Sequence, residues 1–430
     1  MQIHVVQAGQ TLYRIAQTYG VPVESITEAN EISPNNTLVI GQALVIPIVG
    51  QYYWVQQGDT LTSIARRFGT TASAIATANR ISLTAPLNLG LRLYIPPAPK
   101  RNAAVNAYIE PRGGSVSDAL IRAARDAAPH LTYLAPANFR INRDGTLTPP
   151  PLDDLSSIAR SQRVAMMMTV TNMENEQFSA ELGTLILNDQ ALQNKLIANI
   201  LEMAKRLGYR DIHFDIEHLR AEDREAYNRF LRKAVVPIHA AGLSMSTALA
   251  PKTSASQQGA WYSGHDYKAH GQIADFVIIM TYEWGYSGGP PMPVSPIGPV
   301  RSVLEYALTE IPADKIMMGQ NLYGYDWTLP YVHGGAYAKA ISPQAAITLA
   351  RERGAAIQYD YTAQAPHFTY WDDDHKEHRV WFEDARSIQA KFNLLKELHL
   401  RGISYWKLGL SFPQNWLLLE DNFKVTKLLP

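Results

Sequence analysis

Four ionisable residues alternate with apolar ones in the stretch Asp211-Ile212-His213-Phe214-Asp215-Ile216-Glu217. Because successive side chains of a β-strand point to opposite faces, the acidic residues and the histidine share one face and the apolar residues share the other. Two carboxylates and an imidazole directed into a protein interior are costly unless they perform chemistry. A solvated surface strand can show the same alternation, and that alternative stays open for the stretch alone.

The elements around this stretch predict a barrel. From about residue 103 the sequence alternates apolar strands with amphipathic helices, and eight strands spread over roughly 325 residues favour an α/β fold of the (β/α)8 TIM-barrel type over an open doubly wound sheet. The predicted strands are Val105–Glu110, Leu131–Phe139, Val164–Thr171, Asp211–Glu217, Leu243–Ala250, Ala274–Glu283, Ile316–Tyr323 and Ile403–Leu410. The excess length around Pro330–Arg379 is rich in Pro, Asp and His and is predicted to form loops that shape a cleft.

Composition excludes several classes of function. Lys and Arg number 39 and Asp and Glu number 39, so the charge balance indicates neither a nucleic acid nor an anionic membrane as partner. The chain has no cysteine, which excludes disulfides, thiolate nucleophiles and cysteine-bound metals. The sequence contains no apolar run of the roughly 18 residues needed to span a bilayer. A patterned domain begins directly at Met1, so we expect no signal peptide.

The first 97 residues contain an internal repeat. Residues 6–47 align without a gap on residues 55–96, with 18 identical positions. So regular a match indicates duplication of one compact unit. Each copy is predicted to fold as a βααβ unit, with Thr11 and Thr60 at helix N-caps. The proline-rich segment Pro96–Lys100 is predicted to be an extended spacer.

The repeat resembles LysM domains, which bind glycans that contain N-acetylglucosamine. The resemblance rests on Val6-Gln-Ala-Gly-Gln-Thr-Leu12 and Val55-Gln-Gln-Gly-Asp-Thr-Leu61, each followed by Ile-Ala, Asn and a terminal Ile-Pro. It implies that glycan lies across the loop after the first strand and the loop after the second helix. The residues implied are Gly9, Gln10, Thr11 and Ile32 in the first copy and Gly58, Asp59, Thr60 and Ile81 in the second. The alternative, that these residues only form turns and caps, stays open.

The predicted barrel resembles glycoside hydrolase family 18, the chitinases and related N-acetylglucosaminidases. That family ends strand four with Asp-Gly-x-Asp-x-Asp-x-Glu, and residues 210–217 keep its final Asp-x-Glu. Met280-Thr281-Tyr282-Glu283 resembles the Met-x-Tyr-Asp of strand six, and Ile403-Ser404-Tyr405-Trp406 supplies the tryptophan of strand eight. Four features depart from the family pattern. Arg210-Asp211 replaces the leading Asp-Gly, and His213 stands in place of an aspartate. Glu283 replaces the aspartate of strand six, and Met168-Thr169-Val170-Thr171 replaces the Ser-x-Gly-Gly of strand three.

The resemblance implies a retaining hydrolysis in which the substrate's own acetamido oxygen attacks the anomeric carbon. Glu217 would protonate the leaving oxygen and then deprotonate the incoming water. Asp215 would hold the acetamido N–H and stabilise the developing charge. Tyr282 would bond the acetamido oxygen, and Trp406 would stack under the sugar. This mechanism requires no cofactor and no metal.

Other positions carry weaker expectations. His213 is expected either to donate to Asp215 or hold it ionised, or to be a buried structural histidine. Glu283, one methylene longer than the family's aspartate, is a candidate sugar contact. Further candidates for substrate contact are Asn321, Tyr323, Asp326 and Trp327. The run Asp372-Asp373-Asp374-His375-Lys376-Glu377-His378 could suggest a metal site, but we expect a solvated loop. Asp211 is expected to be structural.

Within the family, two LysM-like units before such a barrel resemble the spore cortex-lytic N-acetylglucosaminidases of endospore-forming bacteria. This implies hydrolysis of N-acetylglucosaminyl β-1,4 bonds in cortex peptidoglycan during germination, by a monomer located in the spore coat or cortex, or otherwise associated with the cell wall. A chitinase and a glycan-binding barrel without catalysis stay open as alternatives. The domains expected are residues 1–48 and 51–97 (LysM), 98–104 (linker) and 105–430 (barrel).

Overall fold

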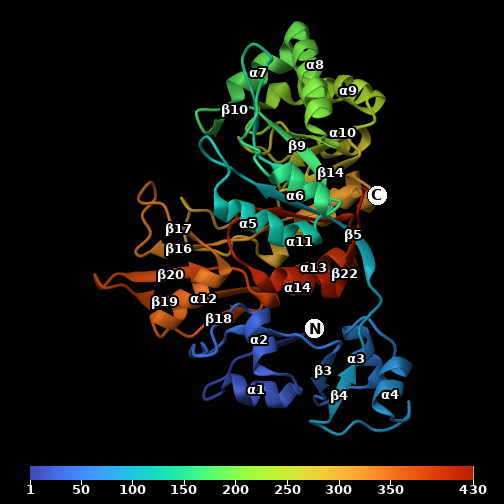
Figure 1. Ribbon diagram of the computed structural model, residues 1–430, viewed down its shortest axis with the longest axis vertical. Coiled ribbons are helices and arrows are strands. Elements are labelled where there is room, and N and C mark those ends of the chain that lie inside the picture. The colour runs from blue at the N-terminus through green and yellow to red at the C-terminus, as the bar shows by residue number, and fades with distance from the viewer. Residues whose placement is uncertain (430) are drawn as a thin grey trace.

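The computed structural model describes residues 1–429. Figure 1 shows two small modules at one end of the molecule and a larger barrel at the other. The first module comprises β1 (Gln2–Val5), α1 (Leu12–Tyr19), α2 (Val23–Ala29) and β2 (Ala43–Ile46). The second module comprises β3 (Gln51–Trp54), α3 (Leu61–Arg67), α4 (Ala72–Asn79) and β4 (Arg92–Ile95). In each module the two strands pair antiparallel, which confirms the predicted βααβ units.

The helix caps follow the prediction as well. Thr11 accepts a hydrogen bond from the backbone N–H of Arg14 at the start of α1. Thr60 and Ser63 form a reciprocal capping box at the start of α3. Gly20 ends α1 with a φ of 70°, a left-handed conformation in which glycine is strongly preferred.

Eight parallel strands close into the predicted barrel. They are β5 (Arg101–Ile109), β6 (Tyr133–Pro136), β9 (Ala165–Thr171), β12 (Asp211–Asp215), β13 (Ser244–Leu249), β14 (Phe276–Ile279), β15 (Ile316–Asn321) and β21 (Gly402–Trp406). The ring is closed by pairing of β21 with β5, where Gly402 lies opposite Ala104. Because β5 begins at Arg101, the last four residues assigned to the linker belong to the first barrel strand.

Helices surround this ring and cover its outer face. They are α5 (Asp118–Ala127), α6 (Leu155–Ser161), α7 (Ala180–Asn188), α8 (Gln190–Leu207), α9 (Arg224–Ala240), α10 (Tyr267–Ile273), α11 (Ile297–Glu310), α13 (Ala385–Glu397) and α14 (Pro413–Asn422). The alternation in β12 is realised as predicted: Ile212 and Phe214 are fully buried beneath the helices, and Phe214 meets Phe230 of α9 edge to face at 5.3 Å. Inside the ring, large side chains from alternate strands fill the interior, among them Tyr133, Met167, Phe276 and Met317.

The prediction of loops between the seventh and eighth strands was wrong. Residues 324–381 form a five-stranded antiparallel sheet in the order β17-β16-β20-β19-β18, together with a helix. Its elements are β16 (Gly324–Thr328), β17 (Lys339–Ile341), α12 (Pro343–Glu352), β18 (Gln358–Asp360), β19 (Ala365–Trp371) and β20 (Glu377–Trp381). In β19, Phe368 and Tyr370 are buried while Thr369 and Trp371 are exposed. The high content of Pro, Asp and His concealed this period-two alternation.

The first module packs directly on the barrel and its added sheet. Val39 joins the apolar core between α12 and the added sheet, and Ala43 and Val45 of β2 join the core around the barrel. The backbone N–H of Ile357 donates to the Ile40 carbonyl at 2.8 Å, and the Arg386 guanidinium donates to the carbonyl of Gly41 at 3.0 Å. Figure 1 shows α2 of this module beneath α14 and β18.

The second module packs on the first. Tyr52 stacks on Tyr19 at 6.5 Å, and the Arg92 guanidinium lies 4.6 Å from the centre of the Tyr52 ring and donates to the carbonyl of Thr18. None of the helices within residues 1–429 has the length and apolar composition required to cross a membrane.

The repeat supplies a matched test of this docking, because Val39 aligns with the exposed Asn88 of the second module. We expect Val39→Asn to lower the free energy of unfolding by about 2 kcal/mol, since it places an amide in an apolar contact. Asn88→Val should change it by less than about 0.5 kcal/mol. Chemical denaturation followed by tryptophan fluorescence measures both, and equal effects would show that the interface contributes nothing.

Candidate active site

The acidic face of β12 opens into a cavity at the C-terminal mouth of the barrel. Asp215 ends the strand and Glu217 follows two residues later, and both carboxyl groups line a cavity of about 390 Å³. Active sites of (β/α)8 barrels lie at this end of the strands. The cavity is also lined by Tyr108, Trp261, Tyr282, Glu283, Tyr323, Tyr325 and Trp406, among others.

Burial governs the protonation of the two carboxyl groups. Burial raises the pKa of Asp215 to about 7. Burial and the nearby charge of Asp215 raise the pKa of Glu217 well above its usual range. Within residues 1–429, Oδ1 of Asp215 is buried and has no hydrogen-bond partner. A carboxyl group that keeps its proton near neutral pH can act as a general acid.

Two residues that the sequence analysis missed hold the backbone of Glu217. Asn172, directly after β9, accepts from the Glu217 N–H at 3.0 Å and donates to the Glu217 carbonyl at 2.9 Å. His265 accepts from the N–H of Ala250 at 2.9 Å, so its other ring nitrogen carries the proton and donates to the Ile216 carbonyl at 2.9 Å. The two contacts fix the segment from both sides. No local motif marked either residue.

Trp261 holds the side chain of Glu217. Its indole N–H donates to Oε2 of Glu217, and the residue lies in the segment between β13 and α10. An N–H donor stabilises the carboxylate over the carboxylic acid, so this contact lowers the pKa of Glu217 and partly offsets the effect of burial. Trp261 belongs to none of the family motifs on strands three, four, six and eight, so no sequence pattern predicted its role.

Tyr282 and Trp406 lie where the resemblance placed them. Tyr282 is buried beside the two carboxyl groups, and burial followed by their charges raises the pKa of its hydroxyl well above the usual range, so it stays a hydrogen-bond donor. Trp406, at the end of β21, lines the cavity and meets the Tyr108 ring edge to face at 5.3 Å. These aromatic side chains give the cavity an apolar wall beside its acidic groups.

The remaining candidates for substrate contact fall into two groups. Glu283 lines the cavity and accepts hydrogen bonds from the hydroxyls of Tyr323 and Tyr325. Asn321 is fully buried and donates to the Tyr323 carbonyl at 2.6 Å, so the structure does not bring it to the cavity. Trp327 is also outside the cavity: it packs on the added sheet and donates to the Gly289 carbonyl at 2.8 Å.

His213 does not pair with Asp215. Its Nε2 lies 2.7 Å from the Tyr108 hydroxyl and its Nδ1 lies 2.8 Å from the Ser246 hydroxyl. Burial lowers the pKa of the imidazole to about 3, so the ring is neutral. Asp211 accepts from the hydroxyls of Ser244 and Ser246, away from the cavity.

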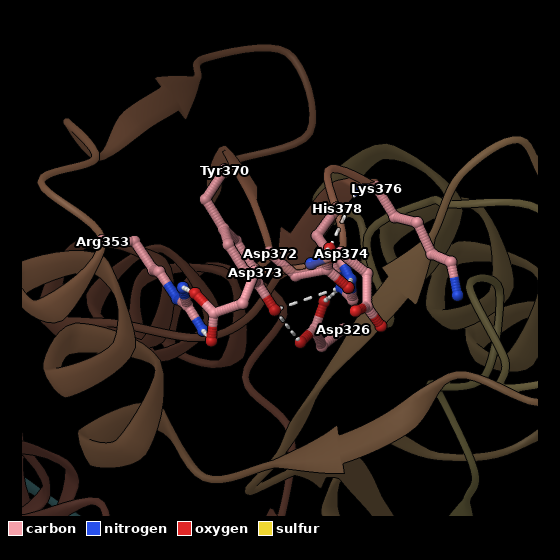
Figure 2. Close-up of polar contacts among 8 residues, drawn as sticks. All are labelled: Asp326, Arg353, Tyr370, Asp372, Asp373, Asp374, Lys376 and His378. Carbon is pink, nitrogen blue, oxygen red and sulfur yellow. Dashed lines mark hydrogen bonds and ion pairs between the residues drawn. The ribbon is translucent and has the colours of Figure 1, made fainter.

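The aspartate run of the added sheet is a hydrogen-bonded turn. Figure 2 shows its carboxylates directed to different partners. Asp372 accepts from the backbone of Lys376 at 2.8 Å and contacts His378, whose other ring nitrogen lies 2.9 Å from Asp326. Asp373 pairs with Arg353 at 2.6 Å. Within residues 1–429 no group of three or more His, Asp and Glu side chains is arranged to hold a metal ion. Asp326 lies on β16, where it contacts His378, and does not line the cavity.

The loop residues implied by the LysM resemblance occupy equivalent places in the two modules. Gln10 and Asp59 accept the backbone N–H of Gln7 and Gln56 respectively, and thereby close the turn before the first helix. Gly9 and Gly58 have φ of 77° and 82° in these turns, and both are exposed. Thr11 and Thr60 form the helix caps described above. Ile32 is buried and Ile81 is partly buried against its own module.

The contact from Trp261 generates a prediction about pH. Glu217 must be protonated to act as the acid, so activity falls on the alkaline side as it ionises. Trp261→Phe removes a donor that favours the carboxylate, so the alkaline limb of the kcat profile should move up by about 1 pH unit. Tyr262→Phe, in the neighbouring position, should leave the limb in place. An alkaline limb that stays put or moves down in Trp261→Phe would contradict the role given to the indole.

The comparisons with known proteins agree with this geometry. Residues 107–410 match the family described as Glycosyl hydrolases family 18, and residues 4–47 and 53–96 each match the LysM domain. The chain is 66% identical over 427 residues to the cortical fragment-lytic enzyme of Bacillus subtilis (strain 168), covering 99% of both chains.

Two solved structures resemble the whole chain. The spore cortex-lytic enzyme SleL of Bacillus megaterium QM B1551 has a TM-score of 0.90 and 56% identity, covering 99% of each chain. SleL of Bacillus cereus has a TM-score of 0.92 and 50% identity, covering 99% of this chain and 98% of that one. The chain therefore belongs to glycoside hydrolase family 18, carries two LysM domains, and is a glycosidase.

Proposed function

We propose that this glycosidase hydrolyses N-acetylglucosaminyl β-1,4 bonds of spore cortex peptidoglycan, acting on cortex fragments during germination. One observation carries the chemistry: Asp215, Glu217 and Tyr282 surround a single cavity in which burial keeps a carboxyl group protonated near neutral pH. The substrate is supported by the cortical fragment-lytic relative, which matches this chain over 99% of its length.

The arrangement suits substrate-assisted catalysis with retention. The substrate's acetamido oxygen attacks the anomeric carbon while the glycosidic bond breaks, and Glu217 gives its proton to the leaving oxygen. Asp215 accepts a hydrogen bond from the acetamido N–H, and Tyr282 donates to the acetamido oxygen and aligns it. Glu217, now a carboxylate, then takes a proton from the water that opens the cyclic intermediate. Trp406 supports the sugar ring from below.

The central test removes the proton donor. Glu217→Gln keeps the shape of the side chain, but the amide can act neither as a general acid nor as a general base, so kcat on purified cortex muropeptides should fall by about a thousand-fold. Glu202→Gln, on the exposed face of α8, is the matched control and should retain wild-type activity. Undiminished hydrolysis by Glu217→Gln would refute the assignment of the acid.

The products separate the remaining alternatives. Mass spectrometry of wild-type digests should show new reducing-end N-acetylglucosamine from cortex fragments, with slower release from colloidal chitin. Faster hydrolysis of chitin would favour the chitinase alternative. A wild-type chain that binds cortex without releasing any reducing end would favour a glycan-binding barrel.

We also propose that the LysM modules bind the polymeric glycan and that the enzyme acts as a monomer located in the spore. For binding, the loop after α4 has an exposed Leu83, which aligns with the exposed Pro34 of the first module. In the first module, this loop is tied to the catalytic half by hydrogen bonds from Gln344 to the carbonyls of Asn30 and Glu31.

The two loops can be tested as a pair. Leu83→Asp should weaken co-sedimentation with insoluble peptidoglycan several-fold, because the free loop of the second module loses an apolar contact with sugar. Pro34→Asp should weaken it less, because the neighbouring backbone is already engaged by Gln344. Neither substitution should alter kcat/KM on soluble muropeptides, which use only the barrel cavity. Equal weakening by both substitutions would show that the two modules bind alike.

A further inference from the structure

Four polar side chains form an unbroken line beneath the substrate cavity. Asp211 accepts from the Ser246 hydroxyl at 2.6 Å, Ser246 Oγ lies 2.8 Å from Nδ1 of His213, and Nε2 of His213 lies 2.7 Å from the Tyr108 hydroxyl. Asp211, His213 and Ser246 are fully buried, and Tyr108 is 3% exposed. The line joins three adjacent or facing strands of the barrel interior, β12, β13 and β5, and ends at the cavity wall.

The number of protons that each side chain carries determines which partner donates in each hydrogen bond. Burial raises the pKa of Asp211 to about 7. Above that pH its carboxylate can only accept, and it accepts from the hydroxyls of Ser244 and Ser246, one on each oxygen. The Ser246 hydroxyl has a single proton, which it donates to Asp211. Its oxygen therefore accepts a hydrogen bond from the Nδ1–H of His213. A neutral imidazole that carries its proton on Nδ1 offers Nε2 as an acceptor. The hydroxyl of Tyr108 therefore donates to His213.

This assignment determines what Tyr108 presents to the cavity. With its proton directed at His213, the phenol oxygen offers only lone pairs to the space above it. The titratable groups near that oxygen are Asp215, Glu217 and Tyr282. Without the line, the hydroxyl could rotate its proton toward the two acidic side chains and compete with the substrate for them.

We propose that Asp211, Ser246 and His213 are positioning residues that act through Tyr108: they fix His213 as the Nδ1–H tautomer and keep the Tyr108 oxygen as a hydrogen-bond acceptor facing the bound sugar. The proposal concerns the same cavity as the proposed function. The kcat changes predicted below rest on that function, whereas the tautomer of His213 does not. His213 thus replaces the family's aspartate in position but has a different role, since neither ring nitrogen contacts Asp215.

The tautomer can be read directly from the full-length wild-type enzyme. In ¹⁵N-histidine-labelled protein above pH 7, where Asp211 is ionised, we expect His213 to show a protonated Nδ1 and an unprotonated Nε2. The His213→Asn spectrum assigns the resonance among the 12 histidines. A protonated Nε2, or a ring that titrates near neutral pH, would overturn the proposal without touching the assignment of Glu217 as the acid.

A double-mutant cycle tests whether the line acts through Tyr108. Ser246→Ala and Tyr108→Phe should each lower kcat on cortex muropeptides by about ten-fold with little change in KM, and the double variant should be no slower than the slower single one. Ser302→Ala, on the exposed face of α11, is the matched control and should stay within about two-fold.

Additive losses in the cycle, or equal losses from Ser302→Ala and Ser246→Ala, would mean that the line is only structural. If Ser246→Ala fails to fold, Ser246→Thr restores the hydroxyl, and the wild-type tautomer still decides the proposal. A wild-type enzyme with the Nδ1–H tautomer but no activity on any muropeptide would count against the proposed substrate instead.

Discussion

The mutual burial of the Asp215 and Glu217 carboxyl groups is the constraint on which the rest of the site depends. Two carboxylates cannot both be ionised at short range in a poorly solvated cavity, so the pair retains a proton near neutral pH. That proton is useful only if it is held where a glycosidic oxygen will arrive. The clamps from Asn172 and His265 on the backbone, and the contact from Trp261 on the side chain, supply this placement.

The cost of burial explains why so much of the surrounding structure is polar yet ordered. Three ionisable side chains around Asp215 have partners chosen by geometry: Asp211 has two serines, His213 has a serine and a tyrosine, and Glu283 has two tyrosines. Oδ1 of Asp215 is the exception among the described residues of this cluster. An unsatisfied buried oxygen is a cost to folding that a substrate N–H can relieve, so binding energy is available at the position where charge develops.

Sequence alone predicted the parts of the molecule that local periodicity encodes. The alternation in residues 211–217 identified the strand and its inward face, and the barrel strands were found within a few residues of their observed bounds. The backbone and side-chain contacts to Glu217 escaped prediction because Asn172, Trp261 and His265 come from segments 44 or more residues away and carry no repeated pattern. Asn321 and Trp327 were placed near the cavity by proximity in sequence, but their side chains turn into the seventh strand's own loop and the added sheet.

The two LysM domains share one fold but pack against different neighbours. Their inner positions are alike, since Ile15 and Ile64, or Ile46 and Ile95, fill the same small cores. Their outer positions differ according to what covers them. Ala43 and Val45 of β2 lie in the barrel's apolar core, whereas the aligned Arg92 and Tyr94 of β4 reach polar groups of the first module. Apolar residues on an outer face are stable only where a neighbour removes them from water. The first domain's sequence therefore requires the barrel beside it, and hydrogen bonds from Gln344 hold the loop after α2 in place, while β4 of the second domain packs against the first domain.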